Sequence, residues 1–334
     1  MINQSASILL KSVSVIIINL NGGEALLACI QSVEMSYVRE IIIVDNGSSD
    51  DSIESCLSFF PNLVVIRNKV NLGFAGPCNQ GAEIAEGDFL LFLNNDAKLT
   101  PGSLEKLVHE ASKDSVAGVS PKIIDEDGGI DSAGSFFTLT GFLHHITEAE
   151  LSFLSASPKR FSLKGACFLV KKRCFFEVGG FDNSFFAYFE ESDLCWRLVN
   201  KEYDLIYLDT AYAIHEGGRT TKKVFKSSFI DYLSFRNRII SIRRNLPLST
   251  KLLILPLHLV CCLLFAFAFL LIGKPKNALA IYRAIIVGTL MSTNGDFLSK
   301  QSFARVNLKT LRPLTTIPHL RNIFDELRRY LVRW

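Results

Sequence analysis

Short apolar runs alternate with helical patterns along the first two thirds of the chain. Val13 to Leu20 is rich in β-branched residues and ends at an Asn-Gly-Gly turn, and Glu24 to Met35 then repeats apolar residues at helical spacing. The same alternation predicts further strands at 40–44, 63–67, 88–93, 117–124, 166–170 and 204–208, and further helices at 52–59, 79–86, 101–113 and 190–201. Because these strands are apolar almost throughout, we expect an α/β fold with a mostly parallel central sheet flanked by helices on both faces.

The remaining segments have weaker patterns. Residues 125–160 mix Gly, Ser, His and Phe without a sustained period, which predicts irregular structure or short strands. After Ser227 the pattern becomes helical and basic. Ligands of open α/β sheets bind beyond the carboxyl ends of the strands. We therefore expect the functional site in the loops that follow Leu20, Val44, Arg67 and Leu93.

Two carboxylates directly follow predicted strands. Asp45 comes after Ile-Ile-Ile-Val, where it can bind a base or ribose or stabilise a turn with Asn46 and Gly47. Asp96 ends an Asn-Asn-Asp sequence that follows five apolar residues. Asp96 can bind a hard divalent cation, which needs little more than one carboxylate and the phosphates of a substrate. The alternative is that Asp96 is the N-cap of the helix predicted after Pro101.

A cluster of acids follows the aromatic run at 185–189. Glu190, Glu191 and Asp193 stand at the start of a predicted helix, where negative charge suits the helix dipole. An apolar pocket also raises the pKa of a carboxyl toward the range of a general base. Arg197 lies one turn after Asp193 and can form an i,i+4 pair with it. The acids therefore fit both a structural role and proton transfer.

His215 follows an apolar stretch and precedes Glu-Gly-Gly-Arg. Such a residue is either a structural histidine or a ligand, and the segment from Gly217 to Arg219 makes an anion-contacting loop plausible. The chain has neither a Walker A loop nor a G-x-G-x-x-G fingerprint, and it lacks a G-x-S-x-G elbow. These absences disfavour P-loop, classical dinucleotide-binding and α/β-hydrolase functions.

Composition is that of an ordinary folded protein. The 334 residues are 49% hydrophobic and 21% charged, which suggests about two domains. Eight cysteines without a C-x-x-C pair indicate reduced thiols in a cytosolic protein. The apolar residues at 8–10 are too few for a signal-peptide core, so we expect the catalytic body to stay in the cytosol.

The charge is unevenly distributed along the chain. From Lys251 onward there are twelve Lys and Arg against three Asp and Glu, a net +9, and the preceding residues carry a net −6. A basic region of this kind indicates an anionic partner, either a membrane or nucleic acid. The uncharged segment 252–272 favours the membrane surface, and we expect no nucleic-acid partner.

The apolar segment is interrupted in its first third by Pro256 and His258. The uninterrupted remainder, 259–272, is too short to span a bilayer, and basic residues lie on both sides of it. We therefore expect in-plane or re-entrant attachment, with Ala278 to Leu290 as a second apolar element. The alternative is a buried helix in a soluble C-terminal domain.

Taken together, the motifs resemble the family-2 inverting glycosyltransferases of the GT-A fold, particularly their bacterial rhamnosyltransferase-like branch. The resemblance runs from about Val13 to Pro247 and rests on SVIIINLNG, VDNGSSD, NKVNLGFAGPCNQG, FLLFLNNDA, DSAG at 131–134, GACFLV, GGFDNSFFAYFEESDLCWR and the His215 loop. It implies a glycosyltransferase domain over 1–226, with a nucleotide-sugar half at about 1–100 and an acceptor half at about 101–226. A basic helical C-terminal region would follow at 227–334.

The resemblance also implies roles for individual residues. Asp45 would contact the nucleobase, and residues 71–79 would line the nucleotide pocket. The implied nucleotide-binding residues are Asn19, Asn21, Asp45, Asn71, Gly73, Asn79 and Asn95. The implied acceptor-side residues are Gly165, Ala166 and Trp196.

The family's metal and base motifs are both altered here. Its Asp-x-Asp motif corresponds to Asn94-Asn95-Asp96, which leaves Asp96 as the one acidic ligand for Mg²⁺ or Mn²⁺. His215 matches a metal-binding histidine of some relatives. The Glu-Asp base motif appears as Glu190-Glu191, which implies Glu191 as general base, with Asp193 as the alternative.

The implied activity is inverting transfer of a sugar from a nucleoside-diphosphate donor to a hydroxyl of a polyprenyl-linked glycan. Rhamnose from dTDP-rhamnose is favoured, with a UDP-sugar as the other donor. We expect a role in surface polysaccharide synthesis, such as O-antigen or capsule, at the cytoplasmic face of the plasma membrane. Two alternatives are a sugar nucleotidyltransferase and a catalytically inactive, membrane-attached scaffold of the same fold.

Overall fold

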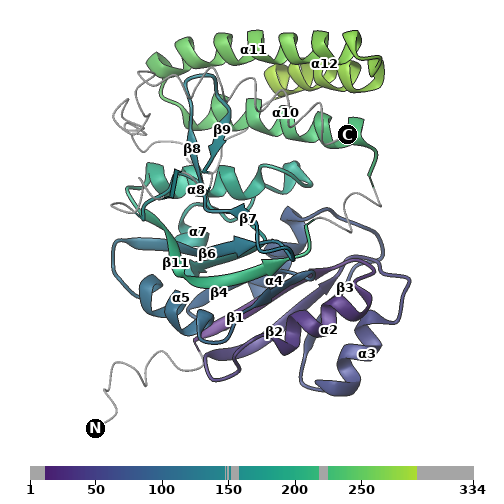
Figure 1. Ribbon diagram of the computed structural model, residues 1–334, viewed down its shortest axis with the longest axis vertical. Helices are drawn as coiled ribbons and strands as arrows, with labels where there is room; N and C mark the ends of the chain where they lie inside the picture. Colours follow the sequence, from purple (N-terminus) through teal and green to yellow (C-terminus); the bar gives the residue numbers. More distant parts are fainter. Residues whose placement is uncertain (1–11, 147, 149, 152–157, 218–224, 292–334) are drawn as a thin grey trace. The chain divides into compact units, whose positions relative to one another are not determined.

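The computed structural model describes residues 12–146, 148, 150, 151, 158–217 and 225–291 (Figure 1). The chain forms two compact units. The first comprises residues 1–135, 145–186 and 190–223, and the second comprises 136–144, 187–189 and 224–334.

The first unit is built on a nine-stranded sheet. Its strands are β1 Val13–Asn19, β2 Val38–Asp45, β3 Val64–Arg67, β4 Phe89–Asn94, β5 Ala97–Leu99, β6 Val116–Ile124, β7 Ile130–Ser132, β10 Cys167–Lys171 and β11 Asp204–His215. They follow the order β3-β2-β1-β4-β10-β6-β11-β5, with β7 beside β6. The helices of this unit are α2 Gly23–Gln31, α3 Ser52–Phe59, α4 Ala75–Ile84, α5 Ser103–Ala111, α7 Lys172–Glu177 and α8 Glu190–Asn200, and a short 3₁₀ turn spans Asn183–Phe185.

The sheet is mixed. Strands β3, β2, β1 and β4 run parallel, as expected, and β6 is parallel to β11. Strand β10 is antiparallel to both of its neighbours, β4 and β6, and β5 is antiparallel to β11. The expectation of an α/β sheet flanked by helices is confirmed, with antiparallel pairing confined to its second half.

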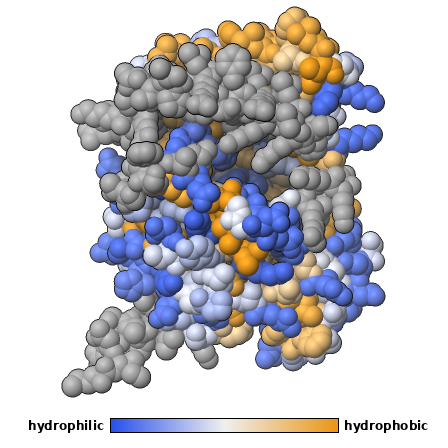
Figure 2. All heavy atoms as spheres, viewed as in Figure 1, coloured by the Kyte–Doolittle hydropathy of each residue, from blue (hydrophilic) through white to orange (hydrophobic). Residues whose placement is uncertain are grey.

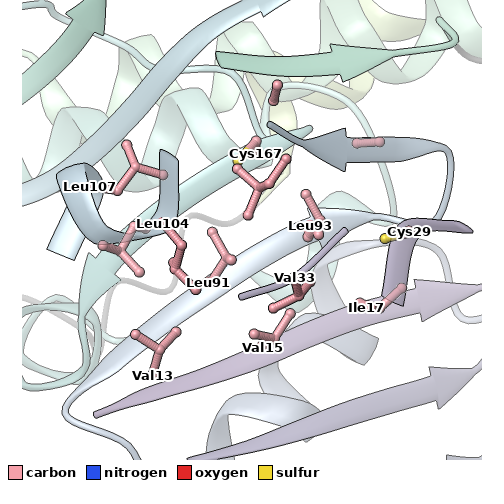
Figure 3. Packing of buried hydrophobic residues seen from close by; sticks show 14 of the residues in the cluster. Val13, Val15, Ile17, Cys29, Val33, Leu91, Leu93, Leu104, Leu107 and Cys167 are labelled. Carbon is pink, nitrogen blue, oxygen red and sulfur yellow. The ribbon is translucent and has the colours of Figure 1, made fainter. Parts of the chain in front are cut away.

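Successive side chains of a strand point to opposite faces of the sheet, so strands that are apolar throughout present two apolar faces. Helices cover both of them. On one face, Val15 and Ile17 of β1 pack with α2 and α5 in a single buried cluster. Figure 3 shows this cluster, with Leu104 and Leu107 of α5 near Leu91 of β4. The opposite face packs against α4 and α7, where the Phe92 and Phe175 rings lie 5.4 Å apart. The carboxyl ends of β1, β2 and β4 are thereby fixed on a rigid core.

Two elements differ from the sequence-based expectation. Strand β5 was not expected, since its three residues follow the polar Asn94-Asn95-Asp96 sequence directly. Strand β11 is longer than the expected 204–208 and reaches His215. Its pairing with β6 shifts register between Leu208 and Tyr212, and the exposed residues at this irregularity interrupt the apolar pattern. His215 consequently lies at the end of a strand and not in a loop.

The second unit is helical. It contains α10 Ser227–Asn245, α11 Leu248–Leu271 and α12 Pro275–Leu290. Strands β8 Ser135–Phe137 and β9 Leu143–His145 form a two-stranded sheet, whose residues 136–144 belong to this unit. Phe142 between the two strands joins a core that includes Phe235 of α10, Phe265 of α11 and Ile281 of α12.

Helix α11 runs unbroken through Pro256, so the expected interruption there is wrong. An internal proline costs about 3 kcal/mol, and packing of Ile254 and His258, both fully buried, offsets this cost. His258 Nδ1 donates to the Thr140 carbonyl at 2.8 Å. Its polar ring therefore faces the core of the unit and does not interrupt the exposed face.

The exposed face of α11 and α12 is mostly apolar, as the hydrophobic colouring at the top of Figure 2 shows. Its exposed side chains include Leu252, Leu264 and Leu271 of α11 and Leu279 and Leu290 of α12. Within the described ranges, α11 alone is long and apolar enough to cross a membrane, a property that buried helices of water-soluble proteins share.

Candidate active site

Asp96 and His215 meet at the end of β4. Strand β5, which follows Asp96, pairs antiparallel with β11, and its register sets Ala97 opposite His215. This pairing brings His215 Nε2 to 3.4 Å from Asp96 Oδ1. Asn94 Nδ2 lies 3.2 Å from the same ring nitrogen. The two residues that the sequence suggested as metal ligands are thus neighbours, although they are far apart along the chain.

The other ring nitrogen of His215 is bonded to Asp131. Nδ1 lies 2.8 Å from Asp131 Oδ2, and Lys164 Nζ forms an ion pair with the same oxygen. Burial alone would lower the pKa of His215, but the bonds to Asp131 and Asp96 outweigh it and raise the pKa to about 8. Burial likewise opposes ionisation of Asp131, yet His215 and Lys164 lower the pKa of its carboxyl.

This donor set fits a hard divalent cation that also binds substrate phosphates. A carboxylate from Asp96 and an imidazole from His215 are two protein ligands, and Mg²⁺ and Mn²⁺ commonly use one or two such groups besides phosphate oxygens. The described residues contain no cluster of three or more His, Cys, Asp or Glu side chains able to hold a metal alone. A histidine backed by a carboxylate is a common arrangement at metal sites.

Asp45 ends β2 and is mostly buried. Its Oδ1 accepts a hydrogen bond from the Ser48 backbone N–H at 3.2 Å, so it does stabilise the turn that follows. Its neighbour Asn46 donates from Nδ2 to Asn71 Oδ1 at 2.9 Å and to the Gly73 carbonyl at 2.7 Å. Asn46 therefore orders the loop expected to line the nucleotide pocket. It was missed as a site-forming residue, although it lies in the same Asp-Asn-Gly motif.

Asn19 and Asn95 bind neighbouring loops of the site, and their assignment to nucleotide binding stays a prediction. Asn19 is fully buried, and its Nδ2 donates to the hydroxyls of Ser48 and Ser52 at 3.1 and 2.9 Å. Its Oδ1 accepts from Asn95 Nδ2 at 3.0 Å. The two amides thereby join the loops after β1, β2 and β4.

Asn21 and Asn79 also bind neighbouring loops. Asn21 adopts a positive φ of 52°, and its Oδ1 accepts from the Ser49 backbone N–H at 2.7 Å. Asn79 donates from Nδ2 to the Phe181 carbonyl and accepts from the Phe181 N–H. These bonds hold the 181–183 turn, and the assignment of Asn79 to direct nucleotide contact stays a prediction.

The segment before α8 has an unusual backbone. Phe186, Tyr188 and Phe189 have φ values of 49°, 68° and 72°, in the left-handed region that bulky residues avoid. Backbone strain of this kind is often found at functional sites, where the surrounding structure enforces it. Here the Phe186 carbonyl accepts a hydrogen bond from Phe74 N at 2.5 Å. The strained segment leads directly into the two acids at the start of α8.

Glu190, which is buried, and Glu191, which is half-buried, lie side by side at the N-terminus of α8. Burial raises the pKa of Glu190, and the charge of Glu191 raises it further. Burial also raises the pKa of Glu191, against the opposing charge of Lys164. One carboxylate oxygen of each has no hydrogen-bond partner within the described part of the chain. A carboxylate with a raised pKa and an unused oxygen is suited to accept a proton.

Gly165 borders Glu191. A Cβ built on Gly165 would lie 3.5 Å from Glu191 Cβ, an ordinary van der Waals contact. Ala166 is buried, and its carbonyl accepts from Asn94 N at 3.0 Å. The assignment of both residues to the acceptor side stays a prediction.

Asp193 and Trp196 both pack inside the first unit, and their assigned roles stay predictions. Asp193 is fully buried and bonded to Arg197 Nε at 2.8 Å, so the expected i,i+4 pair is confirmed. Trp196 is also fully buried, with its ring 5.2 Å from that of Phe161. Of the anion-contacting loop expected at Gly217 to Arg219, residues 218 and 219 lie outside the described residues.

Relatives of known name share this sequence pattern. An N-acetylglucosaminyl-diphospho-decaprenol L-rhamnosyltransferase of Mycobacterium tuberculosis is 28% identical over 207 residues, covering 54% of this chain and 67% of the relative. A low-salt glycan biosynthesis hexosyltransferase, Agl10, of Haloferax volcanii is 25% identical over 244 residues, covering 70% of this chain and 76% of the relative.

Solved structures share the fold at lower identity. S. aureus TarS 1–349 in complex with UDP-GlcNAc has a TM-score of 0.58 and 17% identity, covering 82% of this chain and 81% of that one. A mannosyltransferase of Pyrobaculum calidifontis in complex with GDP-Man and Mn²⁺ has a TM-score of 0.53 and 14% identity, covering 84% and 87%. The model of one family, described as glycosyl transferase family 2, matches residues 14–192, more than half of the chain. The protein therefore belongs to glycosyl transferase family 2.

Proposed function

We propose that this protein is an inverting, metal-dependent glycosyltransferase that moves a sugar, with rhamnose favoured, from a nucleoside diphosphate to a hydroxyl of a lipid-linked glycan. The observation that carries the proposal is the pairing of Asp96 with His215 at one strand end, together with a half-buried Glu191 that has an unused carboxylate oxygen. The rhamnosyltransferase named for a diphospho-decaprenol acceptor supports the choice of sugar and acceptor.

In the proposed reaction, Glu191 accepts the proton of the acceptor hydroxyl as that oxygen attacks the anomeric carbon. A bond forms between the acceptor oxygen and this carbon, and the bond to the donor diphosphate breaks on the opposite side, which inverts the configuration. The raised pKa of Glu191 makes it a stronger base than an exposed glutamate. Asp96 and His215 would hold the cation, which supplies positive charge for the departing diphosphate.

Asp45 and the loop at 71–73 would bind the nucleoside. Asp45 ends β2, and Asn46 holds this loop through three hydrogen bonds, to the side chain of Asn71 and to the backbone of Leu72 and Gly73. A loop ordered before the donor arrives loses less conformational entropy on binding. Such a site would take dTDP-rhamnose or a UDP-sugar.

The helical unit would attach the enzyme to the cytoplasmic face of the plasma membrane, where a polyprenyl-linked acceptor is accessible. Most exposed side chains of α11 and α12 are apolar, with Lys276 and Arg283 of α12 as exposed basic residues, and both helices pack with α10 through their opposite sides. Helices with one packed and one exposed apolar side favour in-plane attachment over spanning. Such an enzyme would act in surface polysaccharide synthesis, such as O-antigen or capsule.

Thermal stabilisation of the detergent-solubilised full chain tests the donor site. The probes are dTDP, UDP, GDP and NADH, each with and without Mn²⁺, on wild type and Asp96→Ala. A ligand at 100 times its dissociation constant adds about 2.7 kcal/mol to stability. Metal-dependent stabilisation by one nucleoside diphosphate that is lost in Asp96→Ala is the expected result. Stabilisation by none of them would contradict the proposed donor site.

A sugar-transfer assay tests the activity itself. The expected result is rhamnose transfer from dTDP-rhamnose to a polyprenyl-diphosphate-linked N-acetylglucosamine, with loss of transfer in Glu191→Gln. Transfer from a UDP-sugar alone would retain the reaction class and reassign the donor. Binding of a nucleotide without any transfer would instead favour the inactive scaffold.

A further inference from the structure

The surroundings of His215 point to another residue of the donor site. We propose that Asp131 is a positioning residue, which orients the His215 ring so that Nε2 faces the metal site beside Asp96. This inference rests on the proposed metal site. It adds a function for Asp131, a residue that the motif comparison left without a role.

The contacts on the two ring nitrogens carry the proposal. Nδ1 is bonded to Asp131 Oδ2 at 2.8 Å, and Nε2 points to Asp96, at 3.4 Å from Oδ1. A carboxylate that accepts from Nδ1 keeps a proton on that nitrogen and leaves Nε2 as the one able to bind a metal. It also fixes the rotation of the ring, which a solvent contact at Nδ1 would leave free.

The sheet holds Asp131 in this position. Strand β7, which contains Asp131, pairs with β6 so that Ile130 lies opposite Ile124. Strand β11 pairs with β6 on its other side, and there Ile214 also lies opposite Ile124. Strand β7 runs antiparallel to β6, and Asp131 lies at the register shift of this pairing, between Ile130 and Ser132. An irregularity of this kind re-aims a side chain, and here the Asp131 carboxylate reaches His215 Nδ1. Functional groups placed on strands are held more precisely than groups on loops.

Lys164 secures the carboxylate. Its Nζ pairs with the same oxygen that accepts from His215, and both side chains are largely buried. Lys164 also precedes Gly165, the residue that borders Glu191. The simpler interpretation is that Asp131 serves only as the ion-pair partner of Lys164. In that case Asp131 would affect stability and leave metal binding unchanged, which makes the two interpretations separable by experiment.

The test is the affinity of the full-length, detergent-solubilised protein for Mn²⁺, measured from the free Mn²⁺ signal in electron paramagnetic resonance. The titrations are made in saturating UDP and, separately, in saturating dTDP. The variants are Asp131→Asn, His215→Ala, the double variant and Lys164→Met. Asp131→Asn is nearly isosteric, and circular dichroism confirms that each variant is folded.

We expect Asp131→Asn to weaken Mn²⁺ binding about 10- to 100-fold, the usual effect of removing a carboxylate behind a metal-bound histidine. The double variant is expected to bind no more weakly than His215→Ala alone, because Asp131 acts through His215. Lys164→Met keeps the bond between Asp131 and His215 and is expected to bind Mn²⁺ at least as well as wild type.

Three results would overturn this role. The first is an Asp131→Asn protein that binds Mn²⁺ as tightly as wild type does. The second is that Asp131→Asn lowers the Mn²⁺ affinity of the His215→Ala protein as much as it lowers that of wild type. The third is a loss in Lys164→Met as large as that in Asp131→Asn, which would assign the effect to the ion pair. Failure of the wild-type protein to bind Mn²⁺ with either nucleotide would instead remove the metal site itself, and with it this inference.

Discussion

Gly73 lies against the backbone of Phe186. A Cβ built on Gly73 would sit 2.1 Å from the Phe186 carbonyl oxygen, and Gly73 itself has a φ of +84°. The loop that would bind the nucleotide is thereby in direct contact with the strained segment that precedes Glu190. Any side chain at Gly73 must move one of these two backbones.

Gly73→Ala is therefore expected to destabilise the protein and weaken donor binding together. The clash and the positive φ should lower the free energy of unfolding by about 3 kcal/mol. Denaturant unfolding and nucleotide titration measure the two effects. Gly102→Ala is the control, since Gly102 also has a positive φ but a Cβ added to it would meet no atom within 4 Å, and it should cost about 1 kcal/mol with donor binding unchanged. Equal effects of both variants would contradict the importance of the Phe186 contact.

Glu191→Gln is expected to lower kcat about 10²- to 10⁴-fold with little change in nucleotide affinity. The base must be deprotonated to act, and burial raises the pKa of Glu191 above that of an exposed glutamate. In wild type, kcat should therefore rise as the pH increases through the raised pKa of Glu191. The residual activity of Glu191→Gln should not show this rise. Measured pH–rate profiles check this. An unchanged profile in Glu191→Gln would move the role of base to another residue, with Glu190→Gln as the next variant.

Asp193→Asn should act on stability because both members of its pair with Arg197 are buried. Removing one partner leaves a buried guanidinium without its counter-charge, which costs about 3–5 kcal/mol. Denaturant unfolding measures the loss, and the fraction of protein that remains folded should retain normal kcat. A large fall in kcat for folded protein would restore Asp193 as a candidate base.

Asp231 is predicted to make the helical unit more stable at mildly acidic pH. Burial raises the pKa of Asp231 to about 6, although Asn277 and Lys274 act against this. The pKa of Asp231 is higher in the folded than in the unfolded protein, so its protonated carboxyl contributes to folding stability. This stabilisation is fully present below about pH 4 and is lost as the pH rises through 6. Asp231→Asn keeps an acceptor for Asn277 Nδ2, which bonds Oδ2 at 2.7 Å. It should stabilise the protein by about 2 kcal/mol at pH 7 and have little effect at pH 4.

Thermal unfolding of both proteins from pH 4 to 7.5 tests this, with the difference between them as the readout. A difference that does not vary with pH would show that Asp231 is ionised in the folded protein throughout this range.

Leu264→Asp and Leu279→Asp are expected to weaken attachment to membranes. Both side chains are more than 60% exposed on α11 and α12, where an inserted apolar side chain contributes to binding. Flotation with anionic vesicles should show a loss of about tenfold or more for each, because a carboxylate is both costly to insert and repelled by anionic lipid. Phe59→Asp, at a similarly exposed residue of the first unit, is the control and should bind as wild type. Equal binding by all variants would remove this face as the attachment surface.

Most of the first unit could be predicted from local patterns. The runs 13–20 and 40–44 became β1 and β2, and the helix at 52–59 has the expected bounds. Apolar periodicity is set by whether one face of a segment is buried, so it is visible in a short stretch of sequence. The same patterns were misleading at Pro256, because the packing that offsets a proline inside a helix comes from residues elsewhere in the second unit.

The sequence by itself determined the order of most strands and helices of the first unit, the loops in which the candidate site lies, and membership of the family. Only the tertiary structure decided which polar residues of those loops face outward and which bind one another. Asn19 and Asp193 match the motif as well as Asp96 does, yet both are fully buried and bonded within the protein. His215 and Asp131 are 84 residues apart in the chain and meet through the register of three strands. Sheet register depends on backbone pairing between distant segments, and no local pattern encodes it.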